Sequence, residues 1–205
     1  MRTKIRSVPR FLLTVLLAAG LLGACGGSGG GNPGVTIEES RPVTVNGEAL
    51  PSLPDSGADP AVGLPMPEVV GASFDGTEVA ITNDGRPKVI IFGAHWCPFC
   101  RDEAEEYTAG FAADGLPQGV DVYFVSTSPD PNRQHYPPSR WLADWPTPVL
   151  ADSVQREVAA AFGLPVFPFN VFVYADGTVA YRAPGAVPYA SFLDAAAFLA
   201  EQAGE

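Results

Sequence analysis

The sequence predicts an α/β domain built around one strand that is buried on both faces. Residues 88–93 (Lys-Val-Ile-Ile-Phe-Gly) form an apolar run without alternation, which is typical of a strand in the middle of an α/β sheet. Two cysteines, Cys97 and Cys100, follow this run and open a segment with helical character. This order places Cys97 at a helix N-terminus, where unpaired backbone N–H groups and the helix dipole stabilise a thiolate.

Length and charge limit the classes of partner. The 205 residues allow one ordinary domain with appendages, and the formal net charge is −11. The first ten residues hold four basic side chains, and the remainder has 8 basic against 23 acidic residues, a balance of −15. Such an acidic body argues against nucleic acid as a partner and against direct adhesion to anionic lipid.

The N-terminus has the parts of a secretory signal. Residues 1–24 combine a basic start with an apolar run over 11–22, which is shorter than the ~20 residues that a membrane-spanning helix needs. Residues 22–25 (Leu-Gly-Ala-Cys) resemble the lipobox of bacterial lipoproteins. This resemblance implies that Cys25 is the first mature residue and carries a lipid on its sulfur. The alternative is an ordinary signal peptide with an incidental cysteine.

The region between this signal and the central strand is rich in Pro, Gly and Ser. A Gly-Ser run over residues 26–31 predicts a flexible tether, and residues 43–50 predict a small hairpin turned at Asn46-Gly47. The five prolines of residues 51–67 predict an extended linker. The predicted organisation is therefore a lipoprotein signal peptide, a lipid-proximal tether with linker, and a folded domain, at residues 1–24, 25–61 and 62–205.

The remaining elements follow from periodicity and turn signals. Strands are predicted at residues 69–73, 78–81, 120–127, 148–150, 170–174 and 178–182, and helices at residues 139–145, 153–162 and 189–202. Ser139 is the predicted N-cap of the first of these helices, and Gly163 is the predicted stop of the second. An apolar stripe of the last helix, including Phe192 and Leu199, is expected to face the core.

The number and spacing of the cysteines favour a reactive pair over a structural disulfide. The chain has three cysteines, so acylation of Cys25 would leave only Cys97 and Cys100 in an oxidising compartment. A disulfide across two residues closes too small a loop to stabilise the fold much. Structural zinc would need two further ligands, and the only candidates are the adjacent His95 and the loop residue His135. A redox pair is therefore favoured, with no metal.

The motif resembles that of a known superfamily. Residues 96–100 (Trp-Cys-Pro-Phe-Cys) after an apolar strand resemble the active site of the thioredoxin superfamily, and Glu103 narrows the resemblance to the extracytoplasmic TlpA/ResA-like branch. The resemblance covers residues 62–203. It implies a thioredoxin-like fold, with a central mixed β-sheet flanked by helices and an N-terminal hairpin extension. It also implies a redox-active disulfide without a cofactor, in which Cys97 attacks and Cys100 resolves.

The acid of the motif has two interpretations. Glu103 lies one turn after Cys100, so the two side chains share a helix face. The resemblance implies that its carboxylate accepts the proton of the less exposed thiol, whereas the alternative is a solvated acid. Thioredoxins have a buried Asp six residues before the first cysteine, but this chain has Ile91. The sequence therefore predicts no proton acceptor from that strand and places the role on Glu103 or on water.

A second segment resembles the superfamily's cis-proline loop. Pro165 and Pro168 compete for the role, and spacing favours Pro168. By this resemblance Phe167 and Pro168 lie opposite the sulfurs and bind substrate together with Trp96 on the rim. His95 is expected to be no more than a surface neighbour.

The functional prediction is a membrane-anchored thiol–disulfide oxidoreductase, a TlpA/ResA-like reductase on the extracytoplasmic side. Its expected partners are cysteines of extracytoplasmic proteins, with apocytochrome c as one candidate in cytochrome c maturation, and a membrane thiol donor or acceptor. The alternatives are an oxidase that introduces disulfides into secreted proteins and, in another class, a non-catalytic binding lipoprotein. A thiol peroxidase is disfavoured because Ala94 stands where its threonine would be.

Overall fold

The computed structural model describes residue 36 and residues 38–204, so the predicted signal peptide, Cys25 and the Gly-Ser run lie outside the described residues. The strands are β1 Thr44–Asn46, β2 Glu68–Ala72, β3 Glu78–Ile81, β4 Lys88–Gly93, β5 Asp121–Ser126, β6 Val149–Ala151, β7 Phe169–Val173 and β8 Val179–Pro184. The helices are α1 Pro98–Asp114, α2 Pro138–Trp141, α3 Glu157–Ala161 and α4 Tyr189–Gln202.

A five-stranded mixed sheet forms the centre, in the order β6-β5-β4-β7-β8. Its middle strand β4 runs parallel to β5 and antiparallel to β7, and all of its residues are buried. The prediction of a central strand buried on both faces is therefore confirmed. A second sheet of three antiparallel strands, in the order β1-β2-β3, contains the predicted hairpin through Asp75-Gly76.

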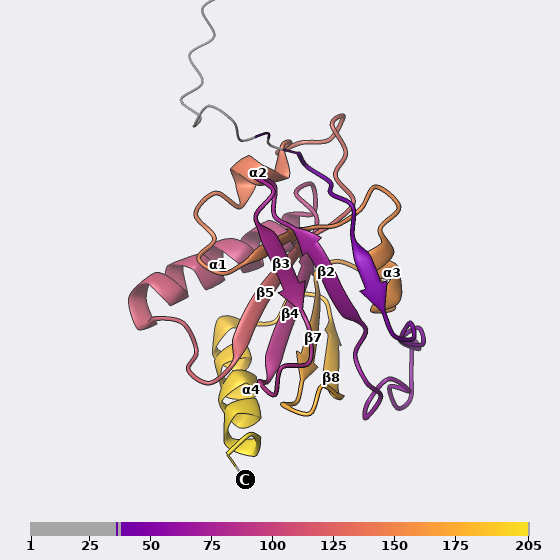
Figure 1. Ribbon diagram of the computed structural model, residues 1–205. Coiled ribbons are helices and arrows are strands. Elements are labelled where there is room, and N and C mark those ends of the chain that lie inside the picture. The colour runs from indigo at the N-terminus through magenta and orange to yellow at the C-terminus, as the bar shows by residue number, and fades with distance from the viewer. Residues whose placement is uncertain (1–35, 37, 205) are drawn as a thin grey trace, which may run out of the picture. The chain divides into compact units, whose positions relative to one another are not determined.

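Two hydrophobic cores lie on opposite faces of the central sheet. On one face, Val69 of β2 and Ile81 of β3 pack over Ile90 and Phe92 of β4, together with residues of α3. On the other face, aromatic and aliphatic side chains of α1 and α4 pack against alternate residues of the same strand, such as Ile91. The domain thus has three layers, and Figure 1 shows β2 and β3 on one side of the central strands with α1 on the other.

The first strand corrects the predicted hairpin at residues 43–50. Gly47 takes the positive φ of a turn, at +93°, but β1 does not pair with the residues that follow it. It pairs antiparallel with β2, with Val45 opposite Val69. An isolated two-stranded hairpin is marginal, and pairing with a distant strand lets Val45 pack against the core and buries Leu50 in it.

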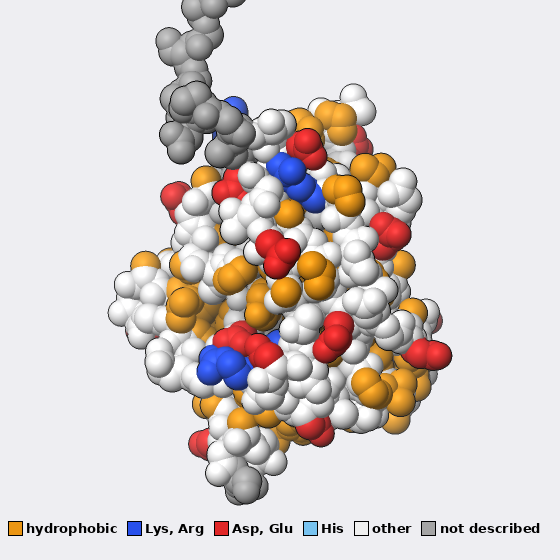
Figure 2. Space-filling view, viewed as in Figure 1, with side chains coloured by type: hydrophobic (Ala, Val, Ile, Leu, Met, Phe, Trp, Pro, Cys, Tyr) orange, Lys and Arg blue, Asp and Glu red, His pale blue; other side chains and the backbone are white. Residues whose placement is uncertain are grey.

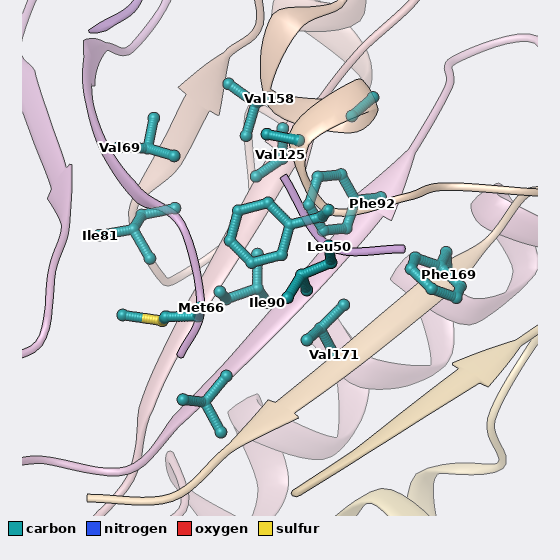
Figure 3. Packing of buried hydrophobic residues seen from close by; sticks show 14 of the residues in the cluster. Leu50, Met66, Val69, Ile81, Ile90, Phe92, Val125, Val158, Phe169 and Val171 are labelled. Atoms are coloured by element: carbon teal, nitrogen blue, oxygen red, sulfur yellow. The ribbon is translucent and has the colours of Figure 1, made fainter. Parts of the chain in front are cut away.

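The segment predicted as linker is also part of the domain. Asp59 makes a two-point ion pair with the fully buried Arg182 of β8, whose guanidinium also donates to the carbonyl oxygen of Pro51 at 3.0 Å. Ala61 is buried, and Figure 3 shows Leu50 and Met66 beside Ile90. The predicted boundary after residue 61 is therefore too late, because an ion pair and apolar contacts hold the preceding residues on the sheet.

Both short helices differ from their predicted forms. The N-cap of α2 is Pro137, and Ser139 lies inside the helix with its N–H and hydroxyl donating to the carboxylate of Glu39 at 2.8 and 2.6 Å. Helix α3 begins only at Glu157, because Asp152 accepts the N–H groups of three later residues and Arg156 adopts a left-handed φ of 61°. In each case a carboxylate outside the helix binds backbone N–H groups near its start, which local sequence does not show.

The charged side chains on the described surface are mostly acidic. Figure 2 shows acidic side chains scattered over the face it presents rather than gathered into one patch. Among residues 36 and 38–204, no helix is long and apolar enough to cross a membrane.

Candidate active site

The two cysteines occupy the start of α1, directly after the central strand. Cys97 is the N-cap residue, with extended backbone, and its Sγ accepts a hydrogen bond from the N–H of Cys100 at 3.2 Å. Pro98 is the first helical residue, where its missing N–H costs nothing and its fixed φ suits the helix. The predicted placement of Cys97 at a helix N-terminus is thus confirmed, with a backbone donor directed at its sulfur.

The two thiols are free and largely buried. Cys97 is 4% exposed and Cys100 is 1% exposed. Burial, reinforced by its hydrogen bond with Cys97, raises the pKa of Cys100 well above the ordinary value for a thiol. Cys100 therefore holds its proton at neutral pH, and it must lose that proton before its sulfur can act as a nucleophile.

Glu103 lies beneath the pair and is not a solvated acid. It is 3% exposed, and its Oε1 accepts hydrogen bonds from Asn170 Nδ2 at 3.0 Å and from the N–H of Val187 at 2.8 Å. Burial raises its pKa from 4.5 to about 7, against the lowering effect of these two hydrogen bonds. The carboxyl group can therefore gain or lose a proton near neutral pH.

Asn170 is a site residue that the sequence reasoning missed. Ile91 of β4 is apolar and offers no proton acceptor. The residue directly opposite it on the neighbouring strand β7, however, is Asn170. Asn170 is fully buried, and its amide contacts Glu103. The signal that would have found it is an amide inside the buried run Phe169–Val173, since a buried polar side chain needs a partner.

The predicted substrate-binding residues meet at the rim of the pair. The peptide bond between Phe167 and Pro168 is cis, as predicted. The ring of Phe167 packs edge-on against that of Trp96, with centroids 5.5 Å apart, and both rings contact the cluster of Ala94, Cys97 and Cys100. Next to the sulfur, Phe99 is 64% exposed. Cys97 thus lies within a rim of aromatic side chains, of which Phe99 extends into solvent.

His95 is buried, which corrects the prediction of a surface neighbour. Its Nε2 accepts the N–H of Asp130 at 3.1 Å, so Nδ1 carries the ring proton and donates to the carbonyl oxygen of Gln134 at 2.8 Å. Burial lowers the pKa of His95. The neutral ring therefore fastens the loop of residues 128–137 beside the cysteines.

Three further contacts join this loop to residues next to the cysteines. Trp96 Nε1 donates to the carbonyl oxygen of Ser128 at 2.9 Å, and the guanidinium of Arg133 lies 4.1 Å from the centroid of its ring. Arg101 Nη1 lies 2.6 Å from His135 Nε2. Composition alone identifies this stretch as a loop, and only the fold brings it against the motif.

The described residues offer little for metal binding. Within residues 36 and 38–204 there is no group of three or more His, Cys, Asp or Glu side chains placed to hold an ion. His95 uses both ring nitrogens in hydrogen bonds to backbone, so it is not available as a ligand beside Cys97.

Comparison with known proteins places these features in a family. A sequence model of the Redoxin family matches residues 61–197. The soluble secreted antigen MPT53 of Mycobacterium tuberculosis is 32% identical over 108 residues, which is 53% of this chain. The chain spans 57% of the length of that relative, and the same values hold for MPT53 of Mycobacterium bovis.

Solved structures share the fold. A secreted Mycobacterium tuberculosis disulfide oxidoreductase homologous to E. coli DsbE has a TM-score of 0.53 and 23% identity over 63% of this chain and 95% of its own. DsbF of the same organism has a TM-score of 0.50 and 25% identity, covering 61% of this chain and 90% of its own. StoA from Bacillus subtilis has a TM-score of 0.52 and 16% identity, covering 66% and 98%.

The family match covers more than half of the chain, and the structural matches cover 61–66% of it. The predicted thioredoxin-like fold is thereby confirmed, with Cys97 and Cys100 at the start of α1. The chain is a member of the Redoxin family.

Proposed function

We propose that the protein is a thiol–disulfide oxidoreductase that uses Cys97 and Cys100 as its redox pair. The observation that carries this proposal is the arrangement of three groups at the start of α1. Cys97 receives a backbone hydrogen bond on its sulfur, Cys100 keeps its proton, and Glu103 titrates near neutral pH. A nucleophilic thiolate, a protonated second thiol and a buried base are the groups that two-step exchange needs.

Reduction of a substrate disulfide takes two steps. The Cys97 thiolate attacks one substrate sulfur and forms a mixed disulfide, while the other substrate sulfur leaves as a thiolate and takes a proton from solvent. Cys100 then gives its proton to Glu103 and attacks Cys97 Sγ, which releases the second substrate sulfur as a thiol after it too takes a proton. The substrate gains two electrons, and the Cys97–Cys100 disulfide forms. The reverse sequence introduces a disulfide into a substrate.

The rim is the proposed substrate-binding surface. Trp96, Phe167 and Pro168 would hold the peptide that carries the target cysteine, with the exposed ring of Phe99 adding apolar contact. No cofactor enters the reaction, because the cysteine pair itself carries the electrons.

An extracytoplasmic location is part of the proposal. Its support is the signal-like N-terminus and the likeness to a relative named as a soluble secreted antigen. Lipid anchoring through Cys25 is the finer proposal, supported by the lipobox-like residues 22–25 and the Gly-Ser run after them. The anchor would hold the domain at the membrane, near a membrane thiol donor or acceptor that recharges the pair.

The direction of exchange divides the remaining candidates. A reductase of the TlpA/ResA-like kind would act on cysteines of extracytoplasmic proteins, with apocytochrome c as one candidate, and an oxidase would insert disulfides into secreted proteins. The pair's reduction potential ranks these two directions. A value near ~−270 mV supports the reductase, and one near ~−120 mV supports the oxidase.

A trapping experiment tests the proposal as a whole. Cys100→Ser in the full chain removes the resolving thiol and is expected to leave covalent partners attached to Cys97, detectable on non-reducing gels. The matched control is the double variant Cys97→Ser, Cys100→Ser, which should trap nothing. Absence of trapped partners, together with a pair that a dithiol cannot reduce after oxidation, would leave the non-catalytic binding lipoprotein as the remaining reading.

A further inference from the structure

We propose that Asn170 is a positioning residue for the exchange reaction, because its side-chain amide holds the Glu103 carboxylate in place to take the proton of Cys100. This inference rests on the proposed exchange activity. It adds to the motif a residue of β7 that lies 67 positions further along the chain than Glu103.

The contacts leave one carboxylate oxygen available. Asn170 Nδ2 and the N–H of Val187 both donate to Oε1 of Glu103, at 3.0 and 2.8 Å. Two donors from different elements fix the side chain of Glu103 on the helix face that it shares with Cys100. Oε2 accepts neither of these hydrogen bonds and can therefore take up a proton.

Strand register brings the amide to this place. Ile91 of β4 and Asn170 of β7 are directly opposite each other in antiparallel strands, so their side chains lie on the same face of the sheet. That face is the one covered by α1, since Ile91 packs in the core with Tyr107 and Phe111 of that helix. Asn170 thus places a polar group under α1, on a face of the sheet where the opposite residue of β4, Ile91, is apolar.

An amide suits this role because it serves both states of the carboxyl group. Its N–H donates to the carboxylate, and its oxygen can accept from the protonated acid after the amide turns over. Asn170 Oδ1 is buried and has no hydrogen-bond partner among the described residues. A lysine at this position would hold Glu103 ionised by its charge, and an aspartate would repel that charge, so either would oppose one of the two states.

The charged groups around Glu103 are few. From its own helix it is faced by Cys100, Glu106 and Tyr107, and burial raises the pKa values of Cys100 and Tyr107, which keeps both neutral near pH 7. The partners that β4 and β7 contribute, Ile91 and Asn170, carry no titratable group. The hydrogen bond from Asn170 is therefore one of the few interactions that favour the ionised form of Glu103.

The proton balance of the step is simple. In the mixed disulfide, the proton of Cys100 moves to Glu103, the new bond forms between the sulfurs of Cys100 and Cys97, and the bond from Cys97 to the substrate sulfur breaks. The electron pair leaves with the substrate sulfur. The substrate disulfide is the only oxidant that the step requires.

The test follows the two thiols separately with 5,5′-dithiobis(2-nitrobenzoate). Reaction of Cys97 in the reduced protein releases one thionitrobenzoate, and attack by Cys100 on the resulting mixed disulfide releases a second. Asn170→Leu removes the amide but keeps the branching and the number of side-chain heavy atoms, and Ser126→Ala removes another buried polar side chain from the same sheet as a matched control. The rates of both phases are measured from pH 5 to pH 10.

We expect Asn170→Leu to change the second phase only. A hydrogen bond to a charged group is worth about one pKa unit or more, so the second phase should slow about tenfold at pH 6 and match the parent near pH 9.5. Ser126→Ala should follow the parent at every pH. The carboxyl carbon of Glu103, followed by NMR, should titrate at higher pH in Asn170→Leu.

Other outcomes would count against the proposal. A second phase that is unchanged by Asn170→Leu at every pH, or a Glu103 carboxyl carbon whose titration does not move, would show that the amide does not act through Glu103. If Asn170→Leu does not fold, the isosteric Asn170→Asp replaces it, and the second-phase inflection should then move upward still further; an unmoved inflection overturns the inference. Failure of the exchange activity itself would differ, because the parent protein would then release no second thionitrobenzoate.

Discussion

Ile91 and Asn170 stand directly opposite each other in the central pair of antiparallel strands, β4 and β7. The pair combines a hydrocarbon side chain, at the position where thioredoxins carry an acid, with a buried amide on the neighbouring strand. That amide reaches Glu103 on α1 at 3.0 Å. The polar group beneath the cysteines is therefore supplied by β7 instead of β4.

Moving the amide from β7 to β4 should restore the rate of Cys100 attack that its removal lowers. We expect Asn170→Ile to slow Cys100 attack at pH 6, and the double variant Ile91→Asn, Asn170→Ile to recover most of the loss, because register partners share one face. The measurement is the second phase of the two-thiol assay. A double variant slower than Asn170→Ile alone, with an unchanged unfolding midpoint, would show that a donor on β4 cannot serve Glu103.

Glu103→Gln should stabilise the protein at alkaline pH. The pKa of Glu103 is about 7 in the folded state against 4.5 as its ordinary value, so the folded state keeps a proton that the unfolded state releases. Stability therefore falls as pH rises from about 4.5 to about 7, and Gln removes this dependence. We expect a gain of up to about 3 kcal/mol in the free energy of unfolding at pH 8, and little gain at pH 4.5.

Urea unfolding of the parent and the variant at both pH values checks this expectation. Glu105→Gln is the matched control, because Glu105 is an exposed acid of the same helix. A Glu103→Gln variant that is equally destabilised at both pH values would mean that the carboxyl group is an ordinary packing element.

Asp59→Ala should destabilise the domain strongly. It would leave the buried guanidinium of Arg182 without its carboxylate partner, and removal of one member of a buried ion pair costs about 3–5 kcal/mol. Asp55→Ala, in the same segment but exposed, should change little. Equilibrium unfolding in urea compares the two variants. If both change the free energy of unfolding equally, residues 51–61 do not contribute to the folded domain through Asp59.

The same ion pair predicts a loss of stability in acid. The hydrogen bond that the Asp59 carboxylate accepts from Arg182 is the main cause of the lowered pKa of Asp59. The stability that this pair contributes is present above the ordinary value of 3.8 and is lost as pH falls through the folded-state pKa. The Asp59→Ala variant should lack this acid-side loss, which unfolding curves between pH 2 and pH 5 would reveal.

The loop of residues 128–137 should loosen in mild acid. Burial lowers the pKa of His95, so below its ordinary value of 6.5 the unfolded ring binds a proton that the folded ring resists. Stability that depends on the neutral ring is complete above that pH and falls below it. Protonation at Nε2 would also break the hydrogen bond from the N–H of Asp130.

Hydrogen exchange at the Asp130 amide, corrected for the intrinsic effect of pH, measures this opening. We expect protection to fall between pH 7 and pH 5 in the parent and to stay level in His95→Gln, which does not titrate. Constant protection in the parent would show that the loop is held without His95.

Local sequence predicted most of the fold and the centre of the site. The apolar run of β4, the cysteine pair and the proline after Cys97 are local signals, because each depends on the chemistry of a few adjacent residues. The cis bond before Pro168 was predicted by resemblance to a family pattern. The spacing from Cys100 identifies Glu103, but it does not predict the burial of this side chain, because a helix position alone does not show what covers it.

The partners of these residues depend on the tertiary structure. Asn170 meets Glu103 only through the register of β4 and β7, and His95 is buried only because the loop of residues 128–137 folds over it. Asp59 gains a role only when Arg182 is placed beside it.

The sequence by itself thus determined where the cysteine pair lies and what precedes and follows it, since strand, cap and helix are set by neighbours along the chain. The tertiary structure decided which groups surround the pair, and with them the proton equilibrium of Glu103 near pH 7. The physical reason is that burial and hydrogen bonding act through space, between residues 67 positions apart in the chain for Glu103 and Asn170.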